Sequence, residues 1–132
     1  MVTTAAPAPF SAVRALRAAA WFGGLGLTLS AVKAATGWGI GCPWRALTGT
    51  RCPLCGATTM GAHLLTGDLP GAWAANPFVL ILLGIGVVAV IAWVIEAAGG
   101  PALRPPGRLR SAAVWWLGLG GAAVAYWIGR NL

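Results

Sequence analysis

The sequence predicts an all-α membrane protein with three transmembrane helices and a cysteine-containing interfacial or re-entrant segment between the first and second. Of its 132 residues, 58% are hydrophobic and only 8% are charged, whereas a water-soluble domain carries about 25% charged residues. Three apolar runs are each long enough to cross a bilayer, which takes about 20 residues. All three cysteines and the only histidine lie together, between the first two runs.

The charge distribution favours a membrane protein over a nucleic-acid-binding protein. The net charge of +7 comes from nine basic residues set against Asp68 and Glu96. Most basic residues flank apolar runs, as charges beside membrane helices do, and they do not cluster on one soluble face. We therefore expect a multi-pass protein of the cell membrane whose partner is the lipid bilayer, with no nucleic acid.

The first apolar run follows a short polar start. Residues 1–17 are expected to form an N-terminal tail, because the first twelve show no apolar period. Residues 18–41 are expected to form the first transmembrane helix, interrupted only by Lys33, whose long side chain can reach the interface. A cleaved signal peptide is the alternative, but no small-residue cleavage site follows the run, so we expect a retained helix.

The second and third runs have clearer boundaries. We expect the second transmembrane helix over residues 77–95, a Pro/Arg-rich loop over 96–111, the third helix over 112–129 and a C-terminal end over 130–132. Asn76 and Pro77 make a favourable helix start, because Asn can cap backbone N–H groups and proline at the first position loses no needed donor. Glu96 is expected to pair with an arginine of the loop. Small residues recur at helical spacing in the third helix, which permits close helix packing, either internal or in self-association.

Three spans place the N-terminus and the loop 96–111 on one side of the membrane, and the cysteine stretch with the C-terminus on the other. Basic residues on cytoplasmic loops set the orientation of a membrane protein. The slightly larger number on the first side favours a cytoplasmic N-terminus and an extracytoplasmic cysteine segment. The first side carries Arg14, Arg17, Arg104, Arg108 and Arg110, and the second carries Lys33, Arg45, Arg51 and Arg130.

Residues 42–76, the cysteine lid, are too polar and glycine-rich to span but too apolar for an ordinary exposed loop. We expect short helices over 58–65 and over 69–75, the second capped by Asp68. The run Cys52-Pro53-Leu54-Cys55-Gly56 is expected to turn both sulfurs toward one point, with Gly56 supplying the positive φ that closes such a turn.

Three kinds of chemistry fit the lid. Structural zinc takes four ligands, and Cys42, Cys52, Cys55 and His63 would supply a three-Cys, one-His set. Cys52 and Cys55 could instead cycle between dithiol and disulfide, with Arg51 favouring a thiolate and Cys42 as a resolving partner. The third interpretation is one disulfide that pins the lid and leaves one thiol over, because the number of cysteines is odd. No catalytic residue is assigned outside the redox pair, because no Ser/His/Asp set or paired carboxylates can be assembled.

A longer pattern surrounds these cysteines: C-P-x-x-x-L-T-G-x-x-C-P-x-C-G-x-T, then L-L-x-G-D-L, then N-P opening a membrane helix. It resembles a family of small bacterial membrane proteins, the domain of unknown function 2752 family. That family commonly has Gly between the two cysteines and Arg after the threonine, whereas this chain has Leu54 and Thr59. The resemblance implies a membrane protein with a cysteine lid and implies no settled activity. The matching residues are Cys42, Pro43, Leu47, Thr48, Gly49, Cys52, Pro53, Cys55, Gly56, Thr58, Leu64, Leu65, Gly67, Asp68, Asn76 and Pro77.

The sequence therefore favours a small accessory or scaffold protein over an enzyme. Its lid would be held by a disulfide or a metal, with zinc as the candidate cofactor, and would contact another membrane protein or a second copy of the chain. A membrane thiol–disulfide oxidoreductase using the Cys52–Cys55 pair is one alternative. A zinc-binding protein with a Cys3His site is the other.

Overall fold

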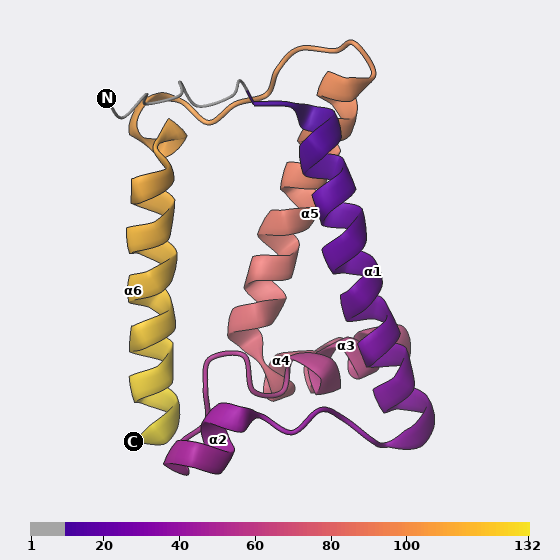
Figure 1. Ribbon diagram of the computed structural model, residues 1–132, viewed down its shortest axis with the longest axis vertical. Helices are drawn as coiled ribbons and strands as arrows, with labels where there is room; N and C mark the ends of the chain where they lie inside the picture. Colours follow the sequence, from indigo (N-terminus) through magenta and orange to yellow (C-terminus); the bar gives the residue numbers. More distant parts are fainter. Residues whose placement is uncertain (1–9) are drawn as a thin grey trace, which may run out of the picture.

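The computed structural model describes residues 10–132, and these form helices and connecting segments with no strand among them (Figure 1). Helices α1, α5 and α6 are long and apolar enough to cross a membrane, and the cysteines lie between α1 and α5. The predicted fold class is therefore confirmed. In chain order the elements are α1 Ala12–Thr36, α2 Pro43–Thr48, α3 Ala57–Leu65, α4 Leu69–Ala75, α5 Pro77–Ala97, η1 Gly107–Arg110 and α6 Ala112–Asn131.

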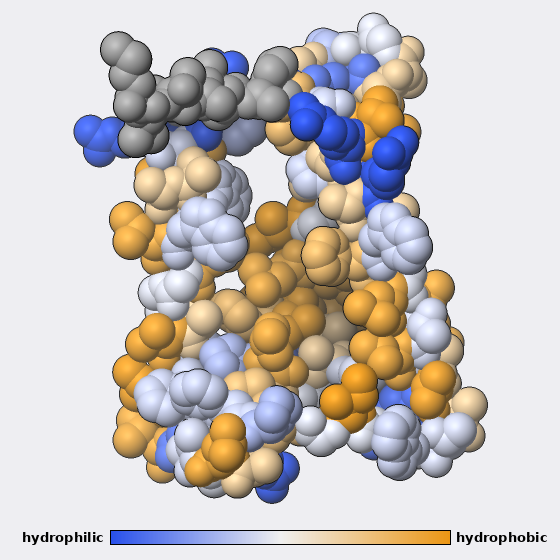
Figure 2. All heavy atoms as spheres, in the orientation of Figure 1, coloured by the Kyte–Doolittle hydropathy of each residue, from blue (hydrophilic) through white to orange (hydrophobic). Residues whose placement is uncertain are grey.

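The three long helices run between two polar ends. Helices α2, α3 and α4 gather at one end, while η1 and the loop after α5 lie at the other (Figure 1). Helix α1 packs on α3 and α5, whereas α6 stands apart as a separate column and meets the rest mainly near its two ends (Figure 1). Hydrophobic residues cover the helices between the ends, and the most hydrophilic residues lie at the ends (Figure 2). This distribution is the one expected of helices immersed in lipid.

Helix α1 has different bounds from the expected span of residues 18–41. It begins at Ala12, inside the segment expected to be a tail, because the Ser11 hydroxyl caps it by accepting from the Arg14 N–H at 3.4 Å. It ends at Thr36, because Gly37 adopts a left-handed conformation with φ 70°. The ammonium of Lys33 donates to the carbonyl of Gly37 at 2.7 Å and so gives that carbonyl, just after the helix end, a hydrogen-bond partner. Residues 1–9 of the expected tail lie outside the described residues.

The later helices begin as expected and extend slightly further. Helices α5 and α6 end at Ala97 and Asn131, beyond the expected limits of 95 and 129. The predicted Glu96 pairing is confirmed, because Arg104 donates to its carboxylate at 2.8 Å. Helix α2 was not predicted. Pro43 at its start and Gly49 (φ 72°) at its end delimit only six residues, too few for an apolar period to be visible.

The lid is docked on α1 through a close helix crossing. A Cβ added at Gly61 of α3 would collide with the side chain of Ser30 of α1, so only glycine allows this approach. Ser30 and Met60, beside the crossing, are both buried. Helix α3 of the lid is thus packed against a membrane helix, as an interfacial segment requires.

Candidate functional site

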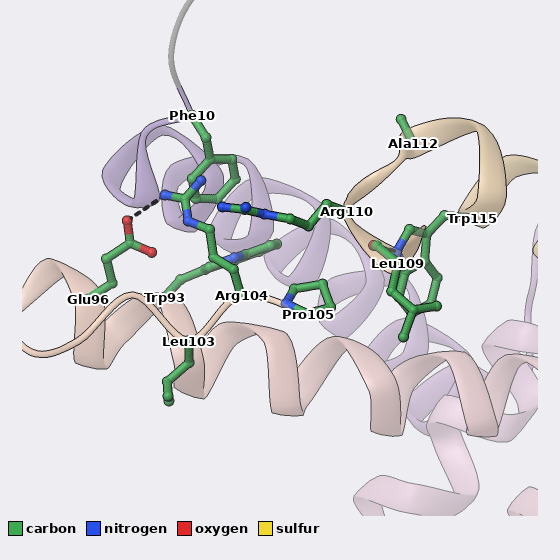
Figure 3. Close-up of a pocket in the computed structure, with 10 residues that line it drawn as sticks. All are labelled: Phe10, Trp93, Glu96, Leu103, Arg104, Pro105, Leu109, Arg110, Ala112 and Trp115. Atoms are coloured by element: carbon green, nitrogen blue, oxygen red, sulfur yellow. Dashed lines mark hydrogen bonds and ion pairs between the residues drawn. The ribbon is translucent and has the colours of Figure 1, made fainter. Parts of the chain in front are cut away.

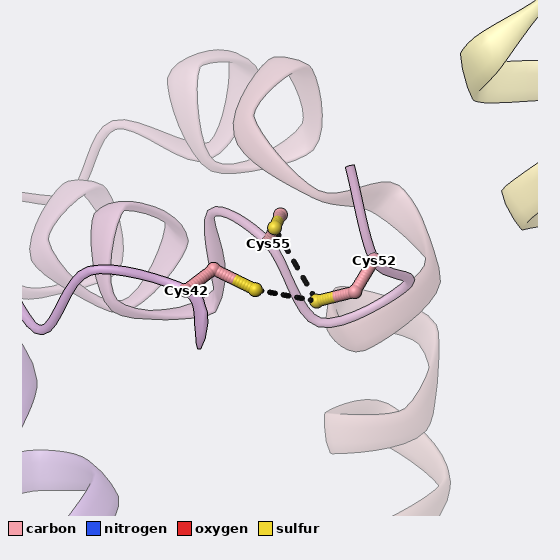
Figure 4. A group of neighbouring side chains, drawn as sticks. All are labelled: Cys42, Cys52 and Cys55. Atoms are coloured by element: carbon pink, nitrogen blue, oxygen red, sulfur yellow. Dashed lines mark hydrogen bonds between the residues drawn. The ribbon is translucent and has the colours of Figure 1, made fainter. Parts of the chain in front are cut away.

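The three cysteine sulfurs converge on one point of the lid (Figure 4). The sulfur of Cys52 is 3.3 Å from that of Cys42 and 3.3 Å from that of Cys55. All three sulfurs lie within 4.8 Å of one another, and all three cysteines are free thiols. Cys52 is therefore the central sulfur of the cluster.

Two local structures bring the sulfurs together. Cys42 is the residue before α2, and Cys52 begins a turn that the Cys55 N–H closes by donating to the Cys52 carbonyl at 3.0 Å. Gly56 then opens α3 with φ 90°, which confirms the predicted positive φ. A side chain at Gly56 would also approach the Ala75 carbonyl to 2.8 Å, so glycine is required there for space as well.

Asn76 holds the Cys52–Cys55 turn through hydrogen bonds to two of its carbonyls. Its side chain is completely buried, and its Oδ1 caps α5 by accepting from the Val79 N–H at 3.0 Å, as predicted. Its Nδ2 donates to the carbonyls of Pro53 at 2.9 Å and Cys55 at 3.0 Å. Asn76 therefore ties the start of a membrane helix to the cysteine turn, a second role that sequence reasoning missed. Pro77 follows in the first turn of α5, as expected.

The end of α6 also forms hydrogen bonds with this turn and with Arg51, the residue before it. Arg130 donates to the carbonyl of Cys55 at 2.9 Å and to that of Ala75 at 3.1 Å. Asn131 accepts from the N–H of Arg51 and donates to its carbonyl, both at 2.9 Å. Arg51 thus contributes its backbone N–H and carbonyl to the site. Sequence reasoning treated Arg130 only as a flanking charge, because nothing in its neighbours along the chain points to the lid.

The thiols of Cys42 and Cys55 have different acidities. The backbone N–H of Arg45, with the Cys52 thiol, lowers the pKa of Cys42 to about 7. Desolvation raises the pKa of Cys55 to about 11, and its bonds to the other two thiols add to this. At neutral pH the cluster therefore holds one thiol that is about half ionised and one that keeps its proton.

His63 lies apart from the sulfurs. Its Nδ1 is 2.8 Å from the Asp68 carboxylate, and no described histidine or carboxylate joins the sulfur group. Asp68 also caps α4, as predicted, by accepting from the Gly71 N–H at 2.8 Å. That N–H, followed by His63, lowers the pKa of Asp68. The structure brings together the three predicted cysteines and assigns His63 and Asp68 to the turn between α3 and α4.

The remaining motif residues frame the lid. Gly67 turns the chain between α3 and α4 with φ 75°, and Thr58 faces the apolar groove between the lid and α1. A separate cavity of about 560 Å³ opens over the sulfurs and is lined by Ile40, Trp44, Arg45 and Leu54 as well as the cysteines. A metal ion or a substrate disulfide could therefore reach the cluster.

Residues 42–91 match the family model described as Protein of unknown function (DUF2752). The matched segment contains the whole cysteine lid and most of α5, so it confirms the resemblance seen in the sequence. No curated protein and no solved structure matches the chain.

Proposed function

We propose that this chain, whose residues 42–91 form a DUF2752 region, is a small accessory or scaffold protein of the membrane whose lid is held by a metal ion. The supporting observation is the convergence of three sulfurs from two separate segments within 4.8 Å. Zinc is the proposed ion, because thiolates are among its preferred ligands. A single disulfide would use only two of the three sulfurs.

The distances between the sulfurs suit a metal. Zinc bound at about 2.3 Å to each sulfur in tetrahedral geometry would hold the sulfurs about 3.8 Å apart. The two separations of 3.3 Å need only a small adjustment of side chains to reach that value. Binding would deprotonate all three thiols, including that of Cys55. The fourth ligand position of the ion would then be open to the cavity over the sulfurs. His63 could fill it only by breaking its bond to Asp68 and turning toward the ion.

A role as a junction explains why the lid needs such a constraint. The turn of Cys52 and Cys55 is bonded to Asn76 at the start of α5 and to Arg130 at the end of α6. Helix α3, which follows the turn directly, packs on α1. One ion at the sulfurs would therefore hold together the segment on which all three membrane helices converge. Such a rigid platform suits contact with another membrane protein.

Elemental analysis of the protein purified in mild detergent tests the metal. We expect about one zinc per chain and its loss in Cys52→Ser, because Cys52 is the central sulfur. Thr59→Ser, a conservative change elsewhere in the lid, should keep the metal. A wild-type protein without stoichiometric metal, or a Cys52→Ser protein that keeps it, would contradict the proposal. Loss in His63→Ala would identify His63 as a fourth ligand, and retention would support an open position.

A thiol–disulfide oxidoreductase is the second candidate, with Cys42 as the attacking thiol in place of the Cys52–Cys55 pair expected from the sequence, because the pKa of Cys42 is lowered and that of Cys55 is raised. Cys42, with a pKa of about 7, has the acidity of an efficient attacking thiol. Its thiolate would attack one sulfur of a substrate disulfide and release the other as a thiolate. Cys52, 3.3 Å away, would then attack the Cys42 sulfur and release the reduced substrate, leaving a Cys42–Cys52 disulfide. A dithiol reductant would have to restore the two thiols.

We also propose that the N-terminus is cytoplasmic and the cysteine lid extracytoplasmic. The guanidinium of Arg130 is occupied by carbonyls of the lid, so it belongs to local structure more than to topology. Five basic residues then remain near the N-terminal side against Lys33, Arg45 and Arg51 on the other, which favours this orientation. The thiols would face an oxidising compartment, where disulfide chemistry is available.

Alkylation mapped by peptide mass spectrometry tests both the second candidate and the orientation. In detergent, the labelling rate of Cys42 should rise between about pH 6 and pH 8 and then level off, because a lowered pKa yields the reactive thiolate at lower pH. A rate that keeps rising to about pH 9 would contradict the redox candidate. In intact cells, a membrane-impermeant maleimide should label Cys42, and protection until the cells are lysed would contradict the orientation.

A further inference from the structure

A second cavity lies at the opposite end of the molecule from the cysteines, where α1 begins, α5 ends and α6 begins (Figure 3). Its volume is about 310 Å³. Because three membrane helices terminate around it, it sits at the level where lipid meets water. The lining side chains that carry its chemistry are Phe10, Trp93, Glu96, Arg104, Arg110 and Trp115.

The charges of this cavity are not balanced. Arg104 is held in place by Glu96 at 2.8 Å and by the Phe10 ring, whose centroid is 4.6 Å from the guanidinium carbon. Arg110 extends from η1 toward the same guanidinium (Figure 3). Within residues 10–132, no carboxylate forms an ion pair with Arg110. Two cations thus share one cavity with one carboxylate, which leaves a positive charge for an anion to neutralise.

The walls of the cavity are apolar and aromatic. The rings of Phe10 and Trp93 contact each other with centroids 6.0 Å apart. Trp115 is fixed by its indole N–H, which donates to the Leu109 carbonyl at 2.7 Å. A small hydrated anion would gain nothing from these walls, whereas an amphiphile would bury apolar surface on them. Tryptophan and arginine together at a membrane boundary are also the residues that contact lipid headgroups.

We propose that this cavity binds the headgroup of an anionic phospholipid. The phosphate diester lies between the guanidinium groups of Arg104 and Arg110, where it restores the charge balance and accepts charge-assisted hydrogen bonds. The glycerol backbone and the first acyl carbons lie against Trp93 and Trp115 and lead into the bilayer beside α5 and α6. The site is independent of the cysteine lid and of the function proposed for it.

Native mass spectrometry of the full chain, released from detergent and titrated with lipid, tests this site. Phosphatidylglycerol should bind more tightly than phosphatidylcholine, and Arg110→Gln should weaken its binding about tenfold or more, as expected for one charge-assisted contact. Arg108→Gln is the matched control. It removes the same charge from the same short helix but does not line the cavity, so it should change binding less than twofold.

Each alternative has its own outcome. Equal weakening by Arg108→Gln and Arg110→Gln would show diffuse attraction to negative lipid and would overturn the site. Equal affinity for phosphatidylglycerol and phosphatidylcholine in the wild-type protein would overturn its charge selectivity. Full displacement of the lipid by millimolar inorganic phosphate would show a site for free phosphate instead of lipid. Recovery of most of the binding in Arg110→Lys, with an unchanged melting temperature in all variants, supports the proposal.

Discussion

Asn76→Ala is expected to destabilise the lid by about 2–6 kcal/mol, because it leaves two buried backbone groups without partners. Asn76 is completely buried and satisfies three backbone groups, the Val79 N–H and the carbonyls of Pro53 and Cys55. Alanine would leave the Val79 N–H and the Pro53 carbonyl without partners, whereas the Cys55 carbonyl would keep its bond from Arg130. Each buried unsatisfied group costs about 1–3 kcal/mol. Thermal unfolding in detergent should show the loss of stability, and Cys55 should become accessible to maleimide at neutral pH.

Asn76→Asp separates the two roles of the side chain. A carboxylate keeps the cap on Val79 but faces the Pro53 and Cys55 carbonyls with an oxygen instead of a donor. We therefore expect α5 to remain capped while the cysteine turn loosens, so that Cys55 becomes reactive in both variants. A wild-type melting temperature and a protected Cys55 in Asn76→Ala would show that the hydrogen bonds of Asn76 do not stabilise the lid.

Arg130→Ala is expected to release the end of α6 from the lid at a cost of about 3–6 kcal/mol. The guanidinium makes two bonds to the carbonyls of Cys55 and Ala75, and hydrogen bonds to charged groups contribute about 1.5–3 kcal/mol each. It also donates to the Tyr126 hydroxyl at 3.0 Å, and the Tyr126 ring stacks on Phe78 of α5 with centroids 5.3 Å apart. Denaturant unfolding in detergent measures the cost. Spin labels placed on α5 and α6 should show a broader distance distribution in the variant.

Two control substitutions identify the origin of that effect. Arg130→Lys keeps the charge but loses the fork that reaches two carbonyls at once, so it should recover less than half of the lost stability. Arg17→Ala removes an exposed charge near the other end of the molecule and should change stability by less than about 0.5 kcal/mol. If Arg130→Lys is as stable as the wild-type protein, the charge of residue 130 stabilises the lid and the forked shape of the guanidinium does not.

The short-range features of this protein were readable along the chain. The three apolar runs predict the membrane helices, because a helix satisfies its own backbone hydrogen bonds in lipid and its own side chains decide whether it can leave water. Asp68 and Asn76 were recognised as caps, and Gly56 as the end of a turn, because each acts on backbone within a few positions. The family pattern marked the lid as one unit, and residues 42–91 match that family.

Other features needed the arrangement of the whole chain. The bond between His63 and Asp68 is one of them, because a carboxylate five positions away suits a histidine nitrogen as well as a metal ion does. Helix α2 was missed because it is too short to show a period. Helix α1 begins before the expected span of residues 18–41, because Arg14 and Arg17 interrupt the apolar run without breaking the helix.

The three apolar helices and the cysteine lid can be recognised from the sequence, because hydropathy, capping and turn formation depend on neighbouring residues. How the lid is held depends on contacts between distant parts of the chain. The Cys55 carbonyl accepts from Asn76, 21 positions away, and from Arg130, 75 positions away. The acceptors in both cases are backbone carbonyls, which every residue carries, so no residue type marks where such bonds form. The position of the Cys52–Cys55 turn rests on these bonds, and it follows from how α5 and α6 meet the lid in space.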